Sequence, residues 1–264
     1  MIFRYENSSC DFDLSILRDD EFCFSVLTRI LGQSPTLTIT DKSTFIICYS
    51  NAPHPVWIWI RDEATLGDME MVYDLVKMNF GFEGEYTFNT KYFFAKYIMA
   101  REPYKITTNL TAYICPMPTK PRKEPIGHIE LATEKDFELL SSYLEEFSHS
   151  VGINPLTTEG ARAKARDLIA KGGLYFWVDE HGDKVATCNY SPVNDQGVIN
   201  AVFVRSDKRK RGYGAILVYE VSKIIVADGR LPVLYADADY VASNACYKSI
   251  GYYSRGSLCT IGIK

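Results

Sequence analysis

The residues most suited to chemistry lie where a β-branched run leads through a basic segment into a helix that opens with glycines. Residues 198–204 predict a strand, residues 208–211 are four consecutive cations, and Gly212 and Gly214 precede apolar positions at helical spacing. The first turn of a helix carries unpaired N–H groups and a partial positive charge, and glycine lets an anion approach them. This stretch therefore predicts a site for a phosphorylated ligand, and a pyrophosphate fits it best.

Two familiar phosphate loops do not fit this stretch. The sequence lacks the G-x-x-x-x-G-K-[ST] pattern of nucleotide hydrolases, and the body of the helix occupies the third glycine position of the dinucleotide fingerprint. The pattern that is present is Arg209-x-x-Gly212-x-Gly214 after a strand ending at Val204. It resembles the acetyl-coenzyme A (acetyl-CoA) loop of the GNAT family of N-acetyltransferases. A basic surface turn before an ordinary amphipathic helix is the alternative that these six residues leave open.

The sequence that follows the loop strengthens this resemblance. Residues 231–237 predict a second buried strand, Asn244 and Tyr247 share one face of a short helix, and Gly251 is suited to end that helix. GNAT proteins close their fold with the same order of loop, helix, strand, short N-x-x-Y helix and final strand. The resemblance covers about Pro125 to Lys264.

The sequence ahead of the loop also follows the order of the family. A strand at 127–131 precedes a helix that begins after Thr133, with a second helix at 157–170. Antiparallel strands are expected at 174–178 and 184–190, before the strand that enters the loop. One strand, two helices and three antiparallel strands resemble the first part of a GNAT domain.

Composition and pattern divide the chain into three segments. The resemblance implies a GNAT N-acetyltransferase domain at 126–264, with an α/β (α+β) fold in which helices flank a mixed, mostly antiparallel central sheet. Residues 116–125 hold four prolines among charged residues, which predicts a semi-rigid linker. Residues 1–115 predict a smaller α+β domain, and three roles stay open for it: a degenerate GNAT-like copy, a lid, or a dimerisation surface. Within it we expect helices at 19–31, 67–79 and 89–99 and strands at 43–50, 56–60 and 104–115.

Composition also limits the partners. The net charge of −4 argues against a surface for nucleic acid, so the cations at 208–211 suit a small polyanion better. No apolar run is long enough to cross a membrane, and the N-terminus does not resemble a signal peptide. The seven cysteines are scattered and include no C-x-x-C pair, so we expect reduced thiols in the cytoplasm and no metal site.

The resemblance assigns roles to individual residues. The N–H groups of residues 211–215 would bind the pyrophosphate of acetyl-CoA. The main chain of residues 202–204 would bind the pantetheine amides, because GNAT strands splay apart there. Asn244 matches the residue that hydrogen-bonds the pantetheine arm, and Tyr247 matches the general acid for the departing thiolate. The implied cofactor-binding residues are Val202, Phe203, Val204, Arg209, Lys210, Arg211, Gly212, Tyr213, Gly214, Ala215, Asn244 and Tyr247, and the implied catalytic residue is Tyr247.

The expected function is direct transfer of an acetyl group from acetyl-CoA to the primary amine of a small molecule or peptide, with homodimer formation left open. Transfer of a longer acyl chain, or transfer to a hydroxyl group, is the enzymatic alternative. A CoA-sensing or regulatory module without turnover is an alternative of another class, and a nucleic-acid-binding module would rest on residues 208–211 alone. No general base is assigned among the candidates Glu146, His149, Asp195, Asn200, Asp237 and Asp239.

Overall fold

The chain forms two compact units in the computed structural model, which describes residues 1–9, 13–151 and 155–263. The N-unit comprises Met1–Ala112, Ala236–Tyr240 and Ser254–Lys264, and the C-unit comprises Tyr113–Tyr235 and Val241–Tyr253. This division differs from the one expected from the sequence. Residues 116–125 lie within the C-unit, and the last strand of the chain completes the N-unit.

The C-terminal strand joins the N-unit through backbone pairing. Strand β12 (Tyr253–Gly262) pairs antiparallel with β5 (Phe88–Thr90), and Cys259 lies opposite Thr90. Cys259 and Ile261 are fully buried in the hydrophobic core of the N-unit. Local sequence patterns predict that a strand forms but not which strand it pairs with, since the partner lies far away in the chain.

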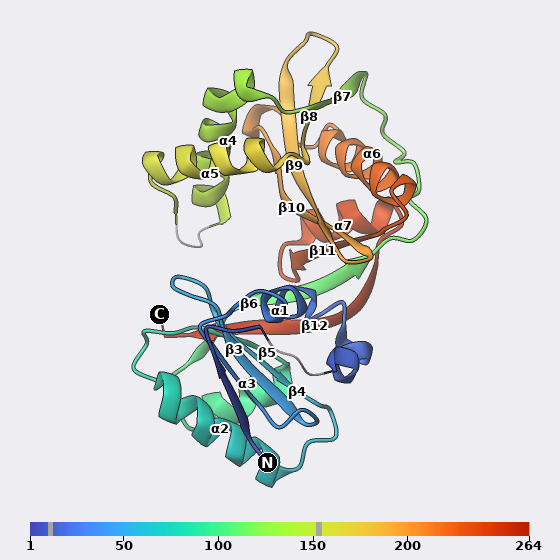
Figure 1. Cartoon of the computed structure of the whole chain (residues 1–264). Helices are drawn as coiled ribbons and strands as arrows, with labels where there is room; N and C mark the ends of the chain where they lie inside the picture. Colours follow the sequence, from blue (N-terminus) through green and yellow to red (C-terminus); the bar gives the residue numbers. More distant parts are fainter. Residues whose placement is uncertain (10–12, 152–154, 264) are drawn as a thin grey trace. The chain divides into compact units, whose positions relative to one another are not determined.

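The C-unit is built on a mixed sheet with the strand order β7–β8–β9–β10–β11 (Figure 1). The first four strands are antiparallel to their neighbours, and β11 is parallel to β10. Helices α4 and α5 cover one face of this sheet and α6 covers the other (Figure 1). The mostly antiparallel sheet flanked by helices is thus confirmed. The elements are β7 (Gly127–Leu131), α4 (Phe137–Val151), α5 (Thr158–Lys171), β8 (Leu174–Asp179), β9 (Lys184–Val193), β10 (Gln196–Val204), α6 (Tyr213–Ala227), β11 (Leu231–Asp237) and α7 (Val241–Ser249).

A glycine in β10 allows α6 to pack closely on the sheet. A Cβ at Gly197 would lie 2.3 Å from Cγ2 of Ile225 in α6, which is too close for any other residue without movement of the helix. On the opposite face, Leu140 of α4 is fully buried in a cluster with Phe176 of β8. Burial of both apolar faces is the main force that holds these layers together.

The N-unit repeats the strand order of the C-unit and the placement of its main helices. Its strand order is β1–β2–β3–β4–β5, with three antiparallel pairs followed by a parallel one. Both units place helical segments between the first two strands, one helix between the fourth and fifth strands, and one helix after the fifth. Among the three roles left open for this region, the repeat favours a copy of the same fold. The elements are β1 (Phe3–Glu6), η1 (Leu14–Asp20), α1 (Ser25–Leu31), β2 (Leu37–Thr40), β3 (Phe45–Tyr49), β4 (Val56–Ile60), α2 (Leu66–Phe80), β5, α3 (Tyr92–Met99) and β6 (Lys105–Ile114), whose last two residues belong to the C-unit.

Local patterns missed the short elements of the N-unit. The helix predicted over 89–99 is wrong at its start, where Asn89 and Thr90 belong to β5, and the helix predicted over 19–31 begins only at Ser25. Strands β1 and β2 had no prediction. Strands of three or four residues carry too few positions for a periodic signal, and their pairing and burial outweigh intrinsic propensity.

Candidate functional site

The candidate site begins where β10 and β11 stop pairing. Their parallel register ends at Ile199, which lies opposite Leu234. From there β10 continues to Val204 alongside β9, with a register shift after Asn200. After Ile199, the main-chain groups of β10 that face β11 therefore take no part in the hydrogen-bonded pairing of these two strands. Residues 202–204, for which the resemblance implies a pantetheine-binding role, fall in this part of β10.

The N-terminus of α6 adjoins this open end of β10. Gly212 has φ +96°, a conformation that favours glycine, and precedes the first turn of the helix at Tyr213, Gly214 and Ala215. The N–H groups of such a first turn have no partner within the helix. A Cβ at Gly214 would lie 3.3 Å from Cγ2 of Val204. The structure therefore brings the predicted pyrophosphate and pantetheine residues next to one another.

Residues 123–125 lie beside the loop, which the sequence did not predict. A Cβ at Gly212 would come within 3.0 Å of Cβ of Lys123 and 3.4 Å of Cδ of Pro125. The Lys123 ammonium donates a hydrogen bond to the carbonyl oxygen of Lys210 at 3.3 Å. A glycine at position 212 is thus explained by its positive φ and by the close approach of residues 123–125. No local signal reveals a contact between residues 87 positions apart.

The four cations of the loop are of two kinds. Arg209, Lys210 and Arg211 are exposed. Lys208 instead forms an ion pair with the buried carboxylate of Asp179, with 2.8 Å between Nζ and Oδ2. Three of the four cations therefore remain at the surface beside α6.

Helix α7 brings the predicted pantetheine and acid residues together on one buried face. Asn244 is 8% exposed and Tyr247 is 7% exposed. The Tyr113 hydroxyl donates a hydrogen bond to Oδ1 of Asn244 at 2.8 Å. The Tyr247 ring packs near the rings of Tyr113 and Tyr252, with centroid distances of 6.4 and 6.1 Å. Sequence reasoning missed Tyr113, because its strand gives no sign of the helix that it contacts.

The surroundings single out no general base. Glu146 and His149 are exposed on α4, and Asn200 is exposed where the register of β10 shifts. Asp195 lies in the turn before β10. The remaining candidates, Asp237 and Asp239, both belong to the N-unit.

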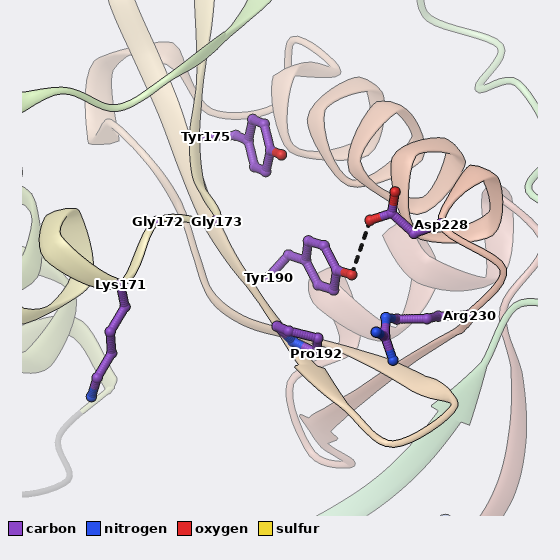
Figure 2. A pocket seen from close by; sticks show the side chains of 8 residues that line it. All are labelled: Lys171, Gly172, Gly173, Tyr175, Tyr190, Pro192, Asp228 and Arg230. Atoms are coloured by element: carbon purple, nitrogen blue, oxygen red, sulfur yellow. Dashed lines mark hydrogen bonds between the residues drawn. The ribbon is translucent and has the colours of Figure 1, made fainter.

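An open pocket lies at the opposite end of α6 (Figure 2). The Tyr190 hydroxyl donates to Oδ2 of Asp228, just past the C-terminus of α6, at 3.2 Å. Figure 2 shows the Tyr175 ring and the Arg230 guanidinium on either side of this pair. None of the predicted site residues lines this pocket. Its lining is Lys171, Gly172, Gly173, Tyr175, Tyr190, Pro192, Asp228 and Arg230.

Three further observations bear on the expected partners. The six cysteines within the described ranges form no disulfide, and Cys10 lies outside those ranges. Across the same ranges, no cluster of His, Cys, Asp or Glu side chains is arranged to hold a metal ion. No helix in the described part of the chain is long and apolar enough to cross a membrane.

Comparisons with known proteins identify the fold. Residues 179–260 match the family model described as FR47-like protein. An acetyltransferase of the GNAT family from Colwellia psychrerythraea has a TM-score of 0.62 at 13% identity, and the match covers 100% of both chains. A GCN5-related N-acetyltransferase from Sphaerobacter thermophilus has a TM-score of 0.65 at 15% identity, covering 98% of this chain and 94% of that one. No curated protein matches the sequence.

The resemblance inferred from the sequence is confirmed at the level of fold. The chain has the architecture of GNAT acetyltransferases, and the matches extend over the N-unit as well as the C-unit. The segment that matches the family model contains the basic loop, α6 and α7.

Proposed function

We propose that this protein transfers an acetyl group from acetyl-CoA to the primary amine of a small molecule or peptide. The proposal rests on the divergence of β10 and β11 after Ile199, at the end of the sheet where a basic loop enters the N-terminus of α6. A pantetheine chain needs main-chain groups that no neighbouring strand uses, and a pyrophosphate needs N–H donors and positive charge. Residues 199–215 offer both in one continuous stretch.

The residues present fit this cosubstrate, which would supply an acetyl group activated as a thioester. The main chain of residues 202–204 would bind the pantetheine amides. The first turn of α6, with the exposed cations Arg209, Lys210 and Arg211, would bind the pyrophosphate. Asn244 on α7 would orient the pantetheine arm.

Tyr247 would handle the proton of the leaving group. The transfer forms a bond between the acceptor nitrogen and the acetyl carbon and breaks the bond between that carbon and sulfur. The nitrogen gives up one proton to solvent or a base, and the thiolate gains one. Phenols and thiols have similar pKa values, so the Oη of Tyr247 is a suitable donor of that second proton.

One observation favours a second candidate function, which is CoA binding without turnover. Tyr247 is only 7% exposed and packs among other tyrosine rings, as a purely structural residue would. The two functions share the cofactor site and differ in the role of the Tyr247 hydroxyl.

Titration calorimetry with acetyl-CoA tests the shared part of both candidates. We expect a micromolar Kd, which corresponds to about −8 kcal/mol. An absence of heat and of any thermal shift at millimolar acetyl-CoA would contradict the proposal. A panel of amines, amino acids, aminoglycosides and peptides, read by release of free thiol, would then separate transfer from binding alone.

A further inference from the structure

The loop that enters α6 is tied to the β8–β9 hairpin by a buried ion pair. The Lys208 ammonium lies 2.8 Å from Oδ2 of Asp179 and 3.6 Å from Oδ2 of Asp183. The side chain of Asp179 is 1% exposed and that of Lys208 is 14% exposed. All three residues belong to the C-unit.

The other carboxylate oxygen of Asp179 closes the hairpin itself. Oδ1 accepts hydrogen bonds from the backbone N–H groups of His181 and Asp183, at 3.0 and 3.1 Å. The hydrogen bond from Lys208, together with these backbone donors, lowers the pKa of Asp179 to about 2. One carboxylate therefore joins two connections, the β8–β9 turn and the β10–α6 loop.

Charge and burial separate Lys208 from its three basic neighbours. Arg209, Lys210 and Arg211 are exposed and available to an anion, whereas Lys208 is neutralised by a partner that is itself out of solvent. A buried carboxylate that loses its cation is left with an uncompensated charge, so the pair resists opening. Moving Lys208 to a phosphate would break this contact.

We propose that Asp179 and Lys208 are positioning residues, which hold the loop so that the exposed cations and the first turn of α6 face the pyrophosphate of acetyl-CoA. Lys208 acts through the loop and does not contact the phosphates. The positioning role rests on the proposed function, because that function supplies the ligand. The anchoring of the loop by the ion pair does not depend on it.

Trypsin tests the anchoring without any ligand, because residues 209–211 are tryptic sites within the loop. We expect Asp179→Asn and Lys208→Met to speed cleavage after these residues about 10-fold, since cleavage follows the opening of the segment. Asp136→Asn is the matched control. It breaks another buried ion pair of the C-unit, in which Asp136 lies 2.6 Å from the Lys184 ammonium. Equal cleavage in Asp179→Asn and Asp136→Asn would overturn the proposal.

Binding of acetyl-CoA to the same variants tests the positioning. We expect Kd to rise about 10-fold in each single variant, with no further rise in the double variant, because the two side chains act as one unit. Asp136→Asn should leave Kd unchanged at a comparable loss of thermal stability. An unchanged Kd in Asp179→Asn would overturn the positioning role.

The dependence of Kd on ionic strength tests whether Lys208 touches phosphate. Salt screens a direct contact between exposed charges, so its removal flattens the dependence. We expect Lys208→Met to keep the dependence of the parent and Arg211→Met to flatten it, whereas flattening in Lys208→Met would contradict the proposal. If the parent does not bind acetyl-CoA, the proposed function fails, and the trypsin comparison still decides whether the pair anchors the loop.

Discussion

Tyr247 carries the most specific chemical expectation among single residues, and its surroundings suit two roles. It shares one face of α7 with Asn244, as a residue that meets the pantetheine should. It also packs against Tyr113 and Tyr252, as a core residue would. The hydroxyl distinguishes the roles, because proton transfer needs the Oη atom and ring packing does not.

Tyr247→Phe is therefore expected to lower turnover about 10²-fold or more while Kd for acetyl-CoA changes little. The measurement is steady-state kinetics with an identified acceptor, where the chemical step limits the rate. Tyr252→Phe is the control, since that residue loses its hydroxyl contact with Ser222 but is not assigned to the reaction. Unchanged turnover in Tyr247→Phe would leave Tyr247 as a packing residue and favour binding without turnover.

Asp179 gives a prediction on pH. Its pKa falls from the ordinary 3.8 to about 2 in the folded protein, first because of the hydrogen bond from Lys208. A group with a lowered folded pKa stabilises the protein above its unfolded pKa, and this contribution disappears as pH falls through the folded value. The parent should therefore exceed Asp179→Asn in free energy of unfolding by a constant amount above about pH 5. Urea unfolding should show this difference shrinking between about pH 4 and pH 2, and a difference independent of pH would contradict the ion pair.

At the scale of elements, the junction of β10 and α6 is the decisive feature. Pairing with β11 ends at Ile199, and the helix begins one short loop later with Gly214 against Val204. The structure places different requirements on the two glycines of the motif. Gly212 has a positive φ and lies beside residues 123–125, whereas a Cβ added at Gly214 would meet, among the described residues outside its own helix, only Cγ2 of Val204 within 4 Å. Gly214 is thus the position where an added side chain tests the ligand rather than the fold.

Gly214→Val should weaken acetyl-CoA binding at least about 10-fold while the melting temperature changes by only a few degrees. The branched side chain would enter the space between the helix N-terminus and the strand end, where the ligand must approach closely. Gly214→Ala, with one added carbon, should give a smaller effect of the same sign. Calorimetry and thermal unfolding check both quantities, and tight binding by Gly214→Val would mean that the phosphate site lies elsewhere.

At the scale of the whole molecule, the same topology occurs twice but only one copy presents a basic loop. In the N-unit, Thr65 and Asp68 form a capping box at the N-terminus of α2, the counterpart of α6, in which each side chain accepts a hydrogen bond from the backbone N–H of the other residue. Beyond the ends of β4 and β5, the ammonium of Lys91 is buried between Asp20 and Asp62, at 2.5 and 2.8 Å. In the N-unit, ion pairs and a capping box thus stand at the strand ends and helix N-terminus that correspond to the proposed cofactor site of the C-unit.

Calorimetry should accordingly give one acetyl-CoA per chain. A carboxylate already occupies the N-terminus of α2, and acidic residues replace the cations of the C-unit, so a second pyrophosphate would be repelled. Gly214→Val is the matched variant, because weakening of the C-unit site should weaken the whole binding signal and leave no component with the affinity of the parent. A stoichiometry of two in the parent would show a working site in the N-unit.

The sequence by itself predicted the fold of the C-unit, which the structure confirms, and a phosphate site at its basic loop, which stays a prediction. The β-branched and aromatic run at 198–204, the helical spacing after Gly214 and the basic run between them are local signals, and the structure has the strand and the helix that they predict. The resemblance to GNAT proteins implied the N-x-x-Y helix, which the structure has at Val241–Ser249. These features are fixed by interactions between residues close in the chain, which is why they are readable from the sequence.

Only the tertiary structure decided the contacts between distant segments. It placed the last strand of the chain in the N-unit, laid residues 123–125 over Gly212 and set Tyr113 against Asn244. It also separated Lys208 from its three neighbours by burying it against Asp179. The four consecutive cations cannot be told apart in the sequence, because the sequence gives the charge of each side chain but not its surroundings. Its burial and its partner depend on which segments the whole fold brings together, and no short stretch contains that information.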